Sequence, residues 1–443
     1  MPVEPESKEF RLVASAAATL QRAGYRTMLV GGSVRDLLIG KTPKDFDLVT
    51  VATPEELAAV FPGRTQLVGA SFGVSLLKLD DCAFEVATAR EERNYLDGRH
   101  PESVRYSNDL RTDVVRRDFT INALMYDPVA HEVVDYVGGA DDLDRGIIRA
   151  VGDPERRFRE DYLRMLRAVR FAGRFGFEIE SSTRSALDKL SHLASQLSGE
   201  RIHEEMSRIL CTVRAAESVR LMADSGLLEA VLPEVAELRG VEQPPQFHPE
   251  GDVFEHTMLM LANMTLPTPN LAWSVLLHDV GKAATFSIEE NGRIRFFGHE
   301  HVGEEIANKI LTRLHFSVAD RESILSAIRN HMRFASVREM KTAKLRKLLA
   351  DDNFALELEL HRLDCISCHG KMECFVYLVD QLRSNGDERL PEPLLRGRDL
   401  IAAGFAPSAR FGKVLHDIYE RQLAGEIEDT SLALELAAKM LSE

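Results

Sequence analysis

Apolar and polar residues follow two different periods along the chain. Residues 9–23 place apolar side chains every three or four positions, which predicts an amphipathic helix ending at Gly24. Short apolar runs then predict strands with brief helices between them. The expected strands are 25–30, 46–51, 73–79 and 83–89, the helices 34–39 and 54–60, and further strand-like pieces lie within 119–136. This mixture predicts a compact α/β head over residues 1–145.

Helical periodicity dominates after Gly152-Asp153-Pro154. The expected helical runs are 155–175, 181–194, 200–211, 214–224, 227–238, 253–265, 271–284, 299–315, 318–331, 340–350 and 353–368. Turn-forming residues at 243–245 and 384–393 divide the helical region. We therefore expect a helical neck over 146–242, a helical domain over 243–383 and a helical tail over 384–443.

Two carboxylates one residue apart, Asp45 and Asp47, open one of the expected strands. Residues two apart on a strand point to the same face, so both can bind one metal site. Upstream lies Gly31-Gly32-Ser33-Val34-Arg35-Asp36, whose glycines let the backbone approach a phosphate while Arg35 clamps it. Together these residues indicate metal-assisted transfer to or from a nucleotide phosphate.

A third motif reads Arg116-Arg117-Asp118-Phe119-Thr120-Ile121-Asn122. Two adjacent arginines beside a phosphate site can hold a triphosphate, and Asp118 and Asn122 can orient the arginines or a sugar hydroxyl. Glu85 lies inside an apolar strand-like run. It either faces solvent or supplies a third carboxylate near the metal.

Charge along the chain is uneven. The formal net charge of −15 argues against a protein that coats nucleic acid without selectivity. Residues 145–174 nevertheless hold nine arginines, no lysine and four acidic residues. A solvated helix face is one interpretation, but planar guanidinium donors suit phosphates and base edges. A spacing of three predicts that one helical stripe contains Asp161, Arg164, Arg167 and Arg170.

Cysteine content and hydropathy suggest a compartment. Five cysteines cannot form a disulfide framework and suit a reducing environment. No run approaches 18 apolar residues and no leader-like segment opens the chain, so a soluble cytoplasmic protein is expected. Cys365, Cys368 and His369 match a haem-attachment pattern, and a zinc site could use Cys365, Cys368 and Cys374. Unremarkable helical thiols are the favoured interpretation.

Histidines gather in the later helical domain. His256, the pair His278-Asp279 after an apolar helical run, and Asp364 occur in the order typical of the HD phosphohydrolase superfamily, which they resemble. Imidazole and carboxylate groups bind divalent metals, so we expect a metal of unspecified identity here. His299, His301 and His331 are candidates for a second metal position.

Head and neck together resemble the class II tRNA nucleotidyltransferases, the family that contains CCA-adding enzymes and bacterial poly(A) polymerases. Besides the three motifs above, the chain has Asp135…Gly138-Gly139…Asp142-Leu143, Glu160-Asp161-x-x-Arg164-x-x-Arg167-x-x-Arg170-Phe171, and Leu395-x-Gly397-x-Asp399-Leu400-Ile401. The resemblance implies a polymerase-β-like nucleotidyltransferase head of α/β class, followed by an all-α body that includes an HD-type domain.

The resemblance also implies an activity: template-independent addition of C, A or both to tRNA 3′ ends from CTP and ATP. Mg²⁺ on Asp45 and Asp47, aided by Glu85, would serve catalysis. Gly32, Arg35 and Arg117 would bind the triphosphate, with Asp118 and Asn122 orienting. Asp161, Arg164 and Arg167 would read the base, and Arg170 would contact phosphate or brace the helix. The expected partner is tRNA, with neither DNA nor a membrane.

Several alternatives stay open at this point. Poly(A) polymerases share this head but usually carry a strongly basic extension, whereas this tail is mixed in charge. The chain could instead be chiefly an HD phosphohydrolase, or its HD domain could be a metal-bound structural element that holds RNA. Residues 91–113, with Arg99-His100-Pro101, resemble the family's flexible loop for switching from C to A, and residues 394–443 would touch the tRNA elbow.

Overall fold

The computed structural model describes residues 7–69, 73–95, 101–246, 248–385 and 390–442. The chain divides into two compact units, Met1–Pro233 and Glu234–Glu443. The finer four-part division expected from the sequence stays a prediction. Among the described residues, no helix has both the length and the apolar composition needed to cross a bilayer.

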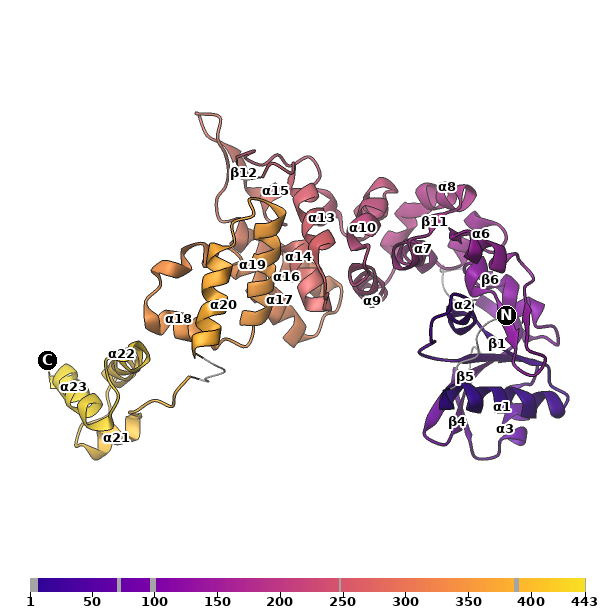
Figure 1. Ribbon diagram of the computed structural model, residues 1–443, viewed down its shortest axis with the longest axis horizontal. Coiled ribbons are helices and arrows are strands. Elements are labelled where there is room, and N and C mark those ends of the chain that lie inside the picture. Colours follow the sequence, from indigo (N-terminus) through magenta and orange to yellow (C-terminus); the bar gives the residue numbers. More distant parts are fainter. Residues whose placement is uncertain (1–6, 70–72, 96–100, 247, 386–389, 443) are drawn as a thin grey trace. The chain divides into compact units, whose positions relative to one another are not determined.

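A seven-stranded mixed sheet forms the base of the first unit (Figure 1). Its spatial order is β3 (Thr65–Gly69), β4 (Val74–Leu79), β5 (Cys82–Thr88), β2 (Asp47–Thr50), β1 (Thr27–Val30), β8 (Met125–Asp127) and β9 (Glu132–Val134). Only β2 and β5 run parallel, because β3 and β4 return the chain between them. The sheet confirms the predicted class and adds β3, which the sequence analysis missed.

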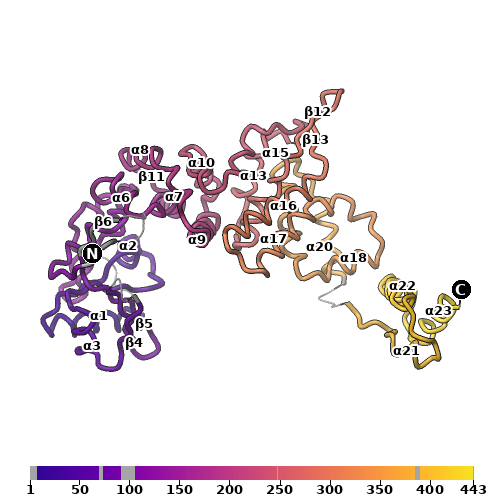
Figure 2. Tube along the Cα trace, turned by 180° about the vertical axis from the view of Figure 1, so that it is seen from behind, coloured from indigo at the N-terminus to yellow at the C-terminus, as the bar shows by residue number. Residues whose placement is uncertain are grey.

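Helices α1 (Lys8–Arg22), α2 (Gly32–Leu38) and α3 (Pro54–Val60) contact strands of this sheet. Two further helices of the region, α4 (Arg111–Val115) and α5 (Gly139–Asp144), contact β6 and β10 respectively. Helix α1 contacts β1 and β2 and lies beside α3 in both views (Figure 1, Figure 2). Its Phe10 ring packs 5.7 Å from that of Phe46, just before β2. Opposite, Met28, Val30 and Val49 share a buried cluster.

The remainder of the first unit is mostly helical. It contains the hairpin β6 (Arg90–Tyr95) and β7 (Pro101–Tyr106), the 3₁₀ turns η1 (Thr120–Asn122) and η2 (Ser191–Gln196), and the short parallel pair β10 (Ile147–Ile148) and β11 (Glu178–Ile179). The helices are α6 (Pro154–Glu160), α7 (Leu163–Phe175), α8 (Ser181–Leu190), α9 (Gly199–Leu210), α10 (Ala215–Asp224) and α11 (Leu227–Val231). Helix α12 (Pro233–Ala236) begins at the last residue of the first unit and continues into the second.

One sequence prediction in this region is wrong. A single helix was expected over 155–175, but α6 ends at Glu160 and α7 starts at Leu163. Asp161 between them has extended backbone angles, φ −152° and ψ 108°. Its carboxylate accepts the backbone N–H of Leu163 at 3.0 Å, a local bond that competes with helix continuation. Asp161 is therefore not on the helix that bears the three arginines.

The second unit is helical apart from the hairpin β12 (Phe286–Ile288) and β13 (Ile294–Phe296), which the sequence analysis also missed. Its helical elements are α13 (Val253–Asn263), α14 (Pro269–Leu277), α15 (Lys282–Thr285), α16 (His299–Arg313), α17 (Val318–Asn330), η3 (Arg333–Glu339), α18 (Thr342–Leu349), α19 (Phe354–Ser367), α20 (Glu373–Asn385), α21 (Gly397–Ala402), α22 (Arg410–Ala424) and α23 (Thr430–Ser442). Helices α13, α14, α17 and α19 contact one another.

Candidate functional site

The carboxylates of the head meet at one end of adjacent strands. Asp45 precedes β2 and Asp47 begins it, while buried Phe46 points the opposite way, as the predicted alternation requires. Leu48 pairs with Val86 in the parallel ladder, so Glu85 lies beside Asp47. Burial first, then Glu85 and Asp45, raise the pKa of Asp47 to about 6. Such crowding of negative charge is the setting in which a bound divalent cation would relieve repulsion.

The glycine turn lies next to these carboxylates. Val30 pairs with Asp47 in the antiparallel ladder, so Gly31 follows directly beside the start of β2. Gly31 has φ +79°, and a Cβ there would stand 3.0 Å from the Arg117 guanidinium. A side chain would therefore be strained and would crowd this arginine. The structure thus brings together the glycine turn, Asp47 and Arg117.

Arg117 is oriented by a buried partner. Asp113 accepts hydrogen bonds from both Arg116 and Arg117, the latter at 2.9 Å from Nε. Arg117 keeps about a fifth of its side chain exposed. Next to it, Asp118 accepts a bond of 3.0 Å from the Asn122 amide. Arg117 is therefore fixed and still accessible to a ligand.

The position of Arg35 differs from that expected of a residue that clamps a phosphate. It is buried, and its guanidinium donates to Asp36 at 2.7 Å and to Asn122 at 2.5 Å. It also lies 5.3 Å and 4.7 Å from the ring centroids of Phe171 and Phe175. Arg35 thus ties α2 to α7, and this geometry favours a bracing role over direct contact with a phosphate.

Every polar member of the predicted recognition stripe has a partner within the first unit. Arg164 bonds Glu160 at 2.9 Å and the carbonyl of Arg116 at 3.0 Å. Arg167 pairs with Asp118 at 2.6 Å. Two further pairs complete the set: Arg170–Glu205 at 2.5 Å and Asp161–Arg201 at 2.9 Å.

These pairs shift the charges of the groups involved. Burial opposes ionisation of Asp118, but Arg167 and Asn122 outweigh it and hold the pKa of Asp118 below its usual range. The same contact, with Asp118 as the largest cause, raises the pKa of Arg167. Burial lowers the pKa of Arg170. A nucleotide base would have to exchange hydrogen bonds with these groups, since they are already engaged.

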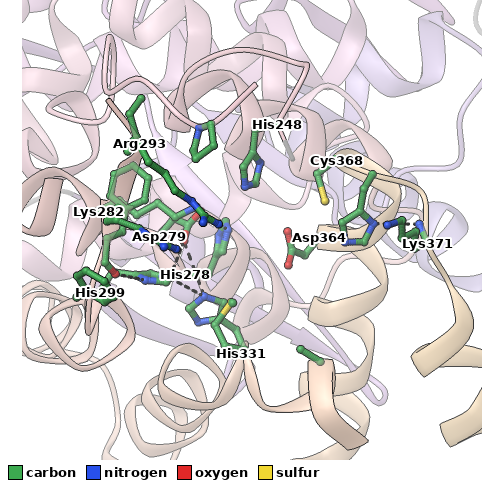
Figure 3. A pocket seen from close by; sticks show the side chains of 18 residues that line it. His248, His278, Asp279, Lys282, Arg293, His299, His331, Asp364, Cys368 and Lys371 are labelled. Atoms are coloured by element: carbon green, nitrogen blue, oxygen red, sulfur yellow. Dashed lines mark hydrogen bonds and ion pairs between the residues drawn. The ribbon is translucent and has the colours of Figure 1, made fainter. Parts of the chain in front are cut away.

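A cluster of histidines and acidic groups forms the centre of the second unit (Figure 3). The Nε2 atoms of His278, His299 and His331 lie 3.0, 3.4 and 3.8 Å from the carboxylate oxygens of Asp279. The Nε2 atoms of His299 and His331 are 3.1 Å apart. His256 completes the set, with Nε2 3.2 Å from Asp364 and Nδ1 2.8 Å from Glu250.

Backbone carbonyls fix the orientation of the three rings around Asp279. The Nδ1 atoms of His278, His299 and His331 lie 2.8, 2.9 and 2.6 Å from the carbonyls of Val275, Phe296 and Ile328. A protonated Nδ1 that donates to a carbonyl leaves Nε2 as a lone-pair donor, the arrangement typical of metal-ligating histidines.

Several buried ligand atoms in this cluster lack a hydrogen-bond partner among the described residues. They are His256 Nε2, His278 Nε2, Asp279 Oδ1 and Glu250 Oε2. Burial lowers the pKa of His331 to about 4, so its ring is neutral and able to bind a metal. Groups of ligand atoms within 4.8 Å of one another join these histidines, Asp279 and Glu250. The residues therefore fit a divalent metal, whose identity they do not specify.

A close backbone approach assembles the cluster. Gly281 follows the His278-Asp279 pair, and a Cβ on it would stand 2.2 Å from the carbonyl oxygen of His299 and 2.5 Å from the amide nitrogen of Gly303. Only glycine therefore lets this turn lie against the start of α16. That contact carries His299 to within reach of Asp279.

Three comparisons with known proteins bear on both sites. The chain matches the Poly A polymerase head domain over 27–149, the probable RNA and SrmB-binding site of polymerase A over 176–238, and the HD domain over 253–358. It is 29% identical over its full length to a full-length relative from Ligilactobacillus salivarius described as a CCA-adding enzyme. The chain is therefore similar to CCA-adding enzymes along its whole length, and it matches the head-domain model of poly(A) polymerases.

Identity to this family is highest in one half of the chain. The CCA-adding enzyme of Geobacillus thermodenitrificans is 41% identical over 218 residues, 49% of this chain and 53% of that relative. The chain thus spans about half the length of such relatives. The solved structure of a Bacillus stearothermophilus CCA-adding enzyme in complex with CTP has a TM-score of 0.74, 24% identity, and coverage of 98% and 99%. That likeness concerns the fold.

The family resemblance did not reveal every residue at the HD site. Sequence analysis missed His248 and Glu250, whose Nδ1 and Oε1 atoms lie 2.8 Å apart, because the HD pattern of histidines begins only at His256. Its candidate His301 is wrong as a ligand, since its side chain is 71% exposed and absent from the metal-binding groups. A signal could have come from the close spacing of His248, Glu250 and His256, of which the first two precede α13 and the third lies in its first turns.

Two further predictions concern the cysteines of the second unit and the loop expected over residues 91–113. No group of described residues able to hold a metal includes Cys365, Cys368 or Cys374. Burial raises the pKa of both Cys365 and Cys368 to about 12, so these thiols stay protonated. Within 91–113, the hairpin β6–β7 is described, whereas Arg99 and His100 lie outside the described residues.

Proposed function

We propose that the chain adds C, A or both to tRNA 3′ ends without a template, using CTP and ATP. The observation that carries this proposal is the meeting of Asp45, Asp47 and Glu85 with the glycine turn and Arg117 in a chain similar to CCA-adding enzymes. An enzyme of this kind would work in the cytoplasm, and its partners would be nucleotides and tRNA rather than DNA or a membrane.

The residues divide the work of the reaction by position. Asp45 and Asp47 would hold Mg²⁺, which when bound would favour ionisation of the primer hydroxyl and stabilise the departing pyrophosphate. Arg117 would bind the triphosphate beside Gly32, and Asp118 and Asn122 would keep the neighbouring arginines aligned. The primer 3′-hydroxyl attacks the α-phosphate, its oxygen forms the new ester bond, and pyrophosphate leaves.

Base selection would fall to Asp161, Arg164 and Arg167, whose carboxylate and guanidinium groups can bond the edges of C and A. Arg170 and Arg35 would instead brace α7, because both are buried and paired. The tail over 394–443 would contact the tRNA elbow. These assignments extend the family relationship to individual residues of this chain.

A decisive experiment uses three tRNA transcripts, ending before CCA, after the first C and after CC. Each is incubated with Mg²⁺ and CTP, ATP or both, and products are resolved at single-nucleotide length. Full CCA on the shortest transcript supports a complete CCA activity. Addition that stops at CC, or ATP use on the CC-ended RNA alone, assigns a partial activity. Long A-tails on all three transcripts would favour a poly(A) polymerase and overturn the proposal.

A second activity is supported by the HD cluster: metal-dependent hydrolysis of a phosphate ester. His256, His278, Asp279 and Asp364 would hold the metal, and the specific observation in favour is that several of their buried ligand atoms make no hydrogen bond with any described residue. When bound, the metal would supply an activated water at neutral pH. If the Asp45→Ala/Asp47→Ala variant hydrolyses phosphate esters but adds no nucleotide, two separate sites exist.

A further inference from the structure

The HD cluster lines a cavity that also contains several basic side chains. Its volume is about 580 Å³, within the range that fits a nucleotide-sized ligand. The carboxylates that line it, Asp279 and Asp364, are both members of the metal cluster. Its basic lining residues are Lys282, Arg293, Arg295 and Lys371. A bound divalent cation would add further positive charge, so the cavity suits a ligand with several negative charges.

Two of these cations have no partner among the residues that the structure describes. Lys282 bonds Asp279 at 2.6 Å and Gln243 at 2.8 Å, and Arg295 pairs with Glu289 at 3.1 Å. By contrast, the side chains of Arg293 and Lys371 make no hydrogen bond or ion pair within the part of the chain that the structure describes. These two charges are therefore available to a ligand.

The two available cations lie on opposite sides of the cavity (Figure 3). Arg293, the residue before β13, extends toward His278 and Asp279, whereas Lys371 lies beyond Asp364 and Cys368. A phosphate at the metal cluster would lie on the side of Arg293, and a phosphate beside Lys371 would lie on the other side of the cavity. The geometry thus separates two anion positions.

An aromatic side chain completes the lining. Phe297 follows β13 with 71% of its side chain exposed, and the Arg295 guanidinium lies 5.7 Å from its ring centroid. Phe296 next to it faces Lys282 instead, at 5.4 Å. An exposed ring at the edge of a basic cavity is a suitable platform for a nucleobase, because base–aromatic stacking needs no particular sequence.

We infer that this cavity binds a nucleotide bearing two separate phosphates, as the last nucleotide of a 3′-phosphorylated RNA does. Arg293 holds the terminal phosphate beside the metal cluster, Lys371 holds the second phosphate, and Phe297 stacks on the base. The inference rests on the proposed HD activity and names its substrate class. It places the β12–β13 hairpin in substrate recognition.

The test measures binding to the full chain loaded with Co²⁺, whose visible absorption reports ligands entering a histidine-rich site. The probes are inorganic phosphate, adenosine 3′-monophosphate and adenosine 3′,5′-bisphosphate. The bisphosphate should bind about tenfold more tightly than the monophosphate, and the monophosphate about tenfold more tightly than inorganic phosphate. Three probes of equal affinity would overturn the inference.

Matched variants assign each contact. Arg293→Gln should weaken all three probes about tenfold, Lys371→Gln should remove only the advantage of the bisphosphate, and Phe297→Ala should weaken the two nucleotides but not inorganic phosphate. Arg383→Gln, 79% exposed on α20 outside the cavity, is the control and should change nothing. Variants indistinguishable from this control would overturn the inference.

The same samples distinguish failure of the inferred nucleotide binding from failure of the proposed HD activity. Loss of the Co²⁺ absorption in the His278→Ala variant establishes that the HD cluster binds the metal, whichever probes bind. A Co²⁺ spectrum insensitive to every probe overturns the inference and leaves the metal site in place. A chain that gives no such spectrum overturns both the HD activity and the inference, and C and A addition is measured independently.

Discussion

The arginines of α7 and the residues of the HD cluster differ in how completely their charged groups are paired. Around α7, each arginine of the expected recognition stripe has a carboxylate within 2.9 Å, so the ligand-free arrangement is already neutralised. In the HD cluster, several buried nitrogen and oxygen atoms make no hydrogen bond, and the side chains of Arg293 and Lys371 make no ion pair, within the described part of the chain. Internal ion pairs can open and close as successive ligands bind and leave. A site that holds a metal permanently instead needs ligand atoms that no other group occupies.

The largest expected effect tests whether the head depends on its own metal. Asp47→Asn removes one negative charge at nearly constant shape and should reduce C and A addition at least about 1,000-fold, since metal stabilisation of the transferring phosphate contributes several kcal/mol. Single-nucleotide gels measure it. Asp141→Asn, exposed on α5, is the control. Activity within tenfold of the parent chain would remove Asp47 from catalysis.

The next effect isolates the HD cluster. His278→Ala should weaken divalent-metal binding at least about 100-fold, because it removes a buried ligand, and should leave C and A addition unchanged. Equilibrium dialysis with metal analysis gives the affinity. His301→Ala, 71% exposed nearby, should retain the metal. Equal metal content in the two variants would contradict the assignment of the cluster.

A smaller effect concerns stability of the internal pairs. Arg167→Gln leaves the buried Asp118 without its partner and should lower the free energy of unfolding by about 2 kcal/mol at pH 7, less than for a fully buried pair because Arg167 is 31% exposed. Urea unfolding measures it, with Arg159→Gln, exposed on α6, as the control.

The pH dependence of that difference has a definite sign. The folded pKa of Asp118 lies below its unfolded value near 4, so the stabilisation is present above that pH and is lost as pH falls below it. The gap between the parent chain and Arg167→Gln should therefore shrink in acid. A gap that grows below pH 4 would show that Asp118 is not the group responsible.

The smallest effect sharpens the role of the pairs in selectivity. Arg201→Gln frees the Asp161 carboxylate and should change the ratio of CTP to ATP use by about threefold, consistent with loss of one partly exposed pair. Arg208→Gln, on the same helix with an exposed partner, is the control. An unchanged ratio accompanied by lower stability would make Arg201 a purely structural residue.

Sequence patterns predicted the helices and strands better than they predicted the contacts between them. Helix α3 and strands β1, β2, β4 and β5 lie close to their expected positions because period and turn residues act locally. The Asp161 break was missed because a single side-chain hydrogen bond overrides a continuous helical pattern. The β12–β13 hairpin was missed because three-residue strands carry almost no periodic signal.

For the sites, the order of residues along the chain predicted the members of the HD cluster but not the residues that pair with them. His256, His278, Asp279 and Asp364 were all expected, and the structure brings them together. The burial of Arg35 and the pairing of Arg167 with Asp118 depend on packing between segments distant in sequence. Neither contact produces a recognisable pattern in the neighbouring sequence, so the sequence analysis assigned both arginines to ligand binding alone.

The tight turn at Gly281 has a genetic consequence. Every glycine codon becomes an alanine codon by one change at its second base, so a single point mutation can introduce the methyl group that this turn has no room for. Such an allele would separate α15 from α16 and disperse the histidine cluster while every ligand-encoding codon stayed intact. Clinical or laboratory surveys that score only ligand positions would overlook it.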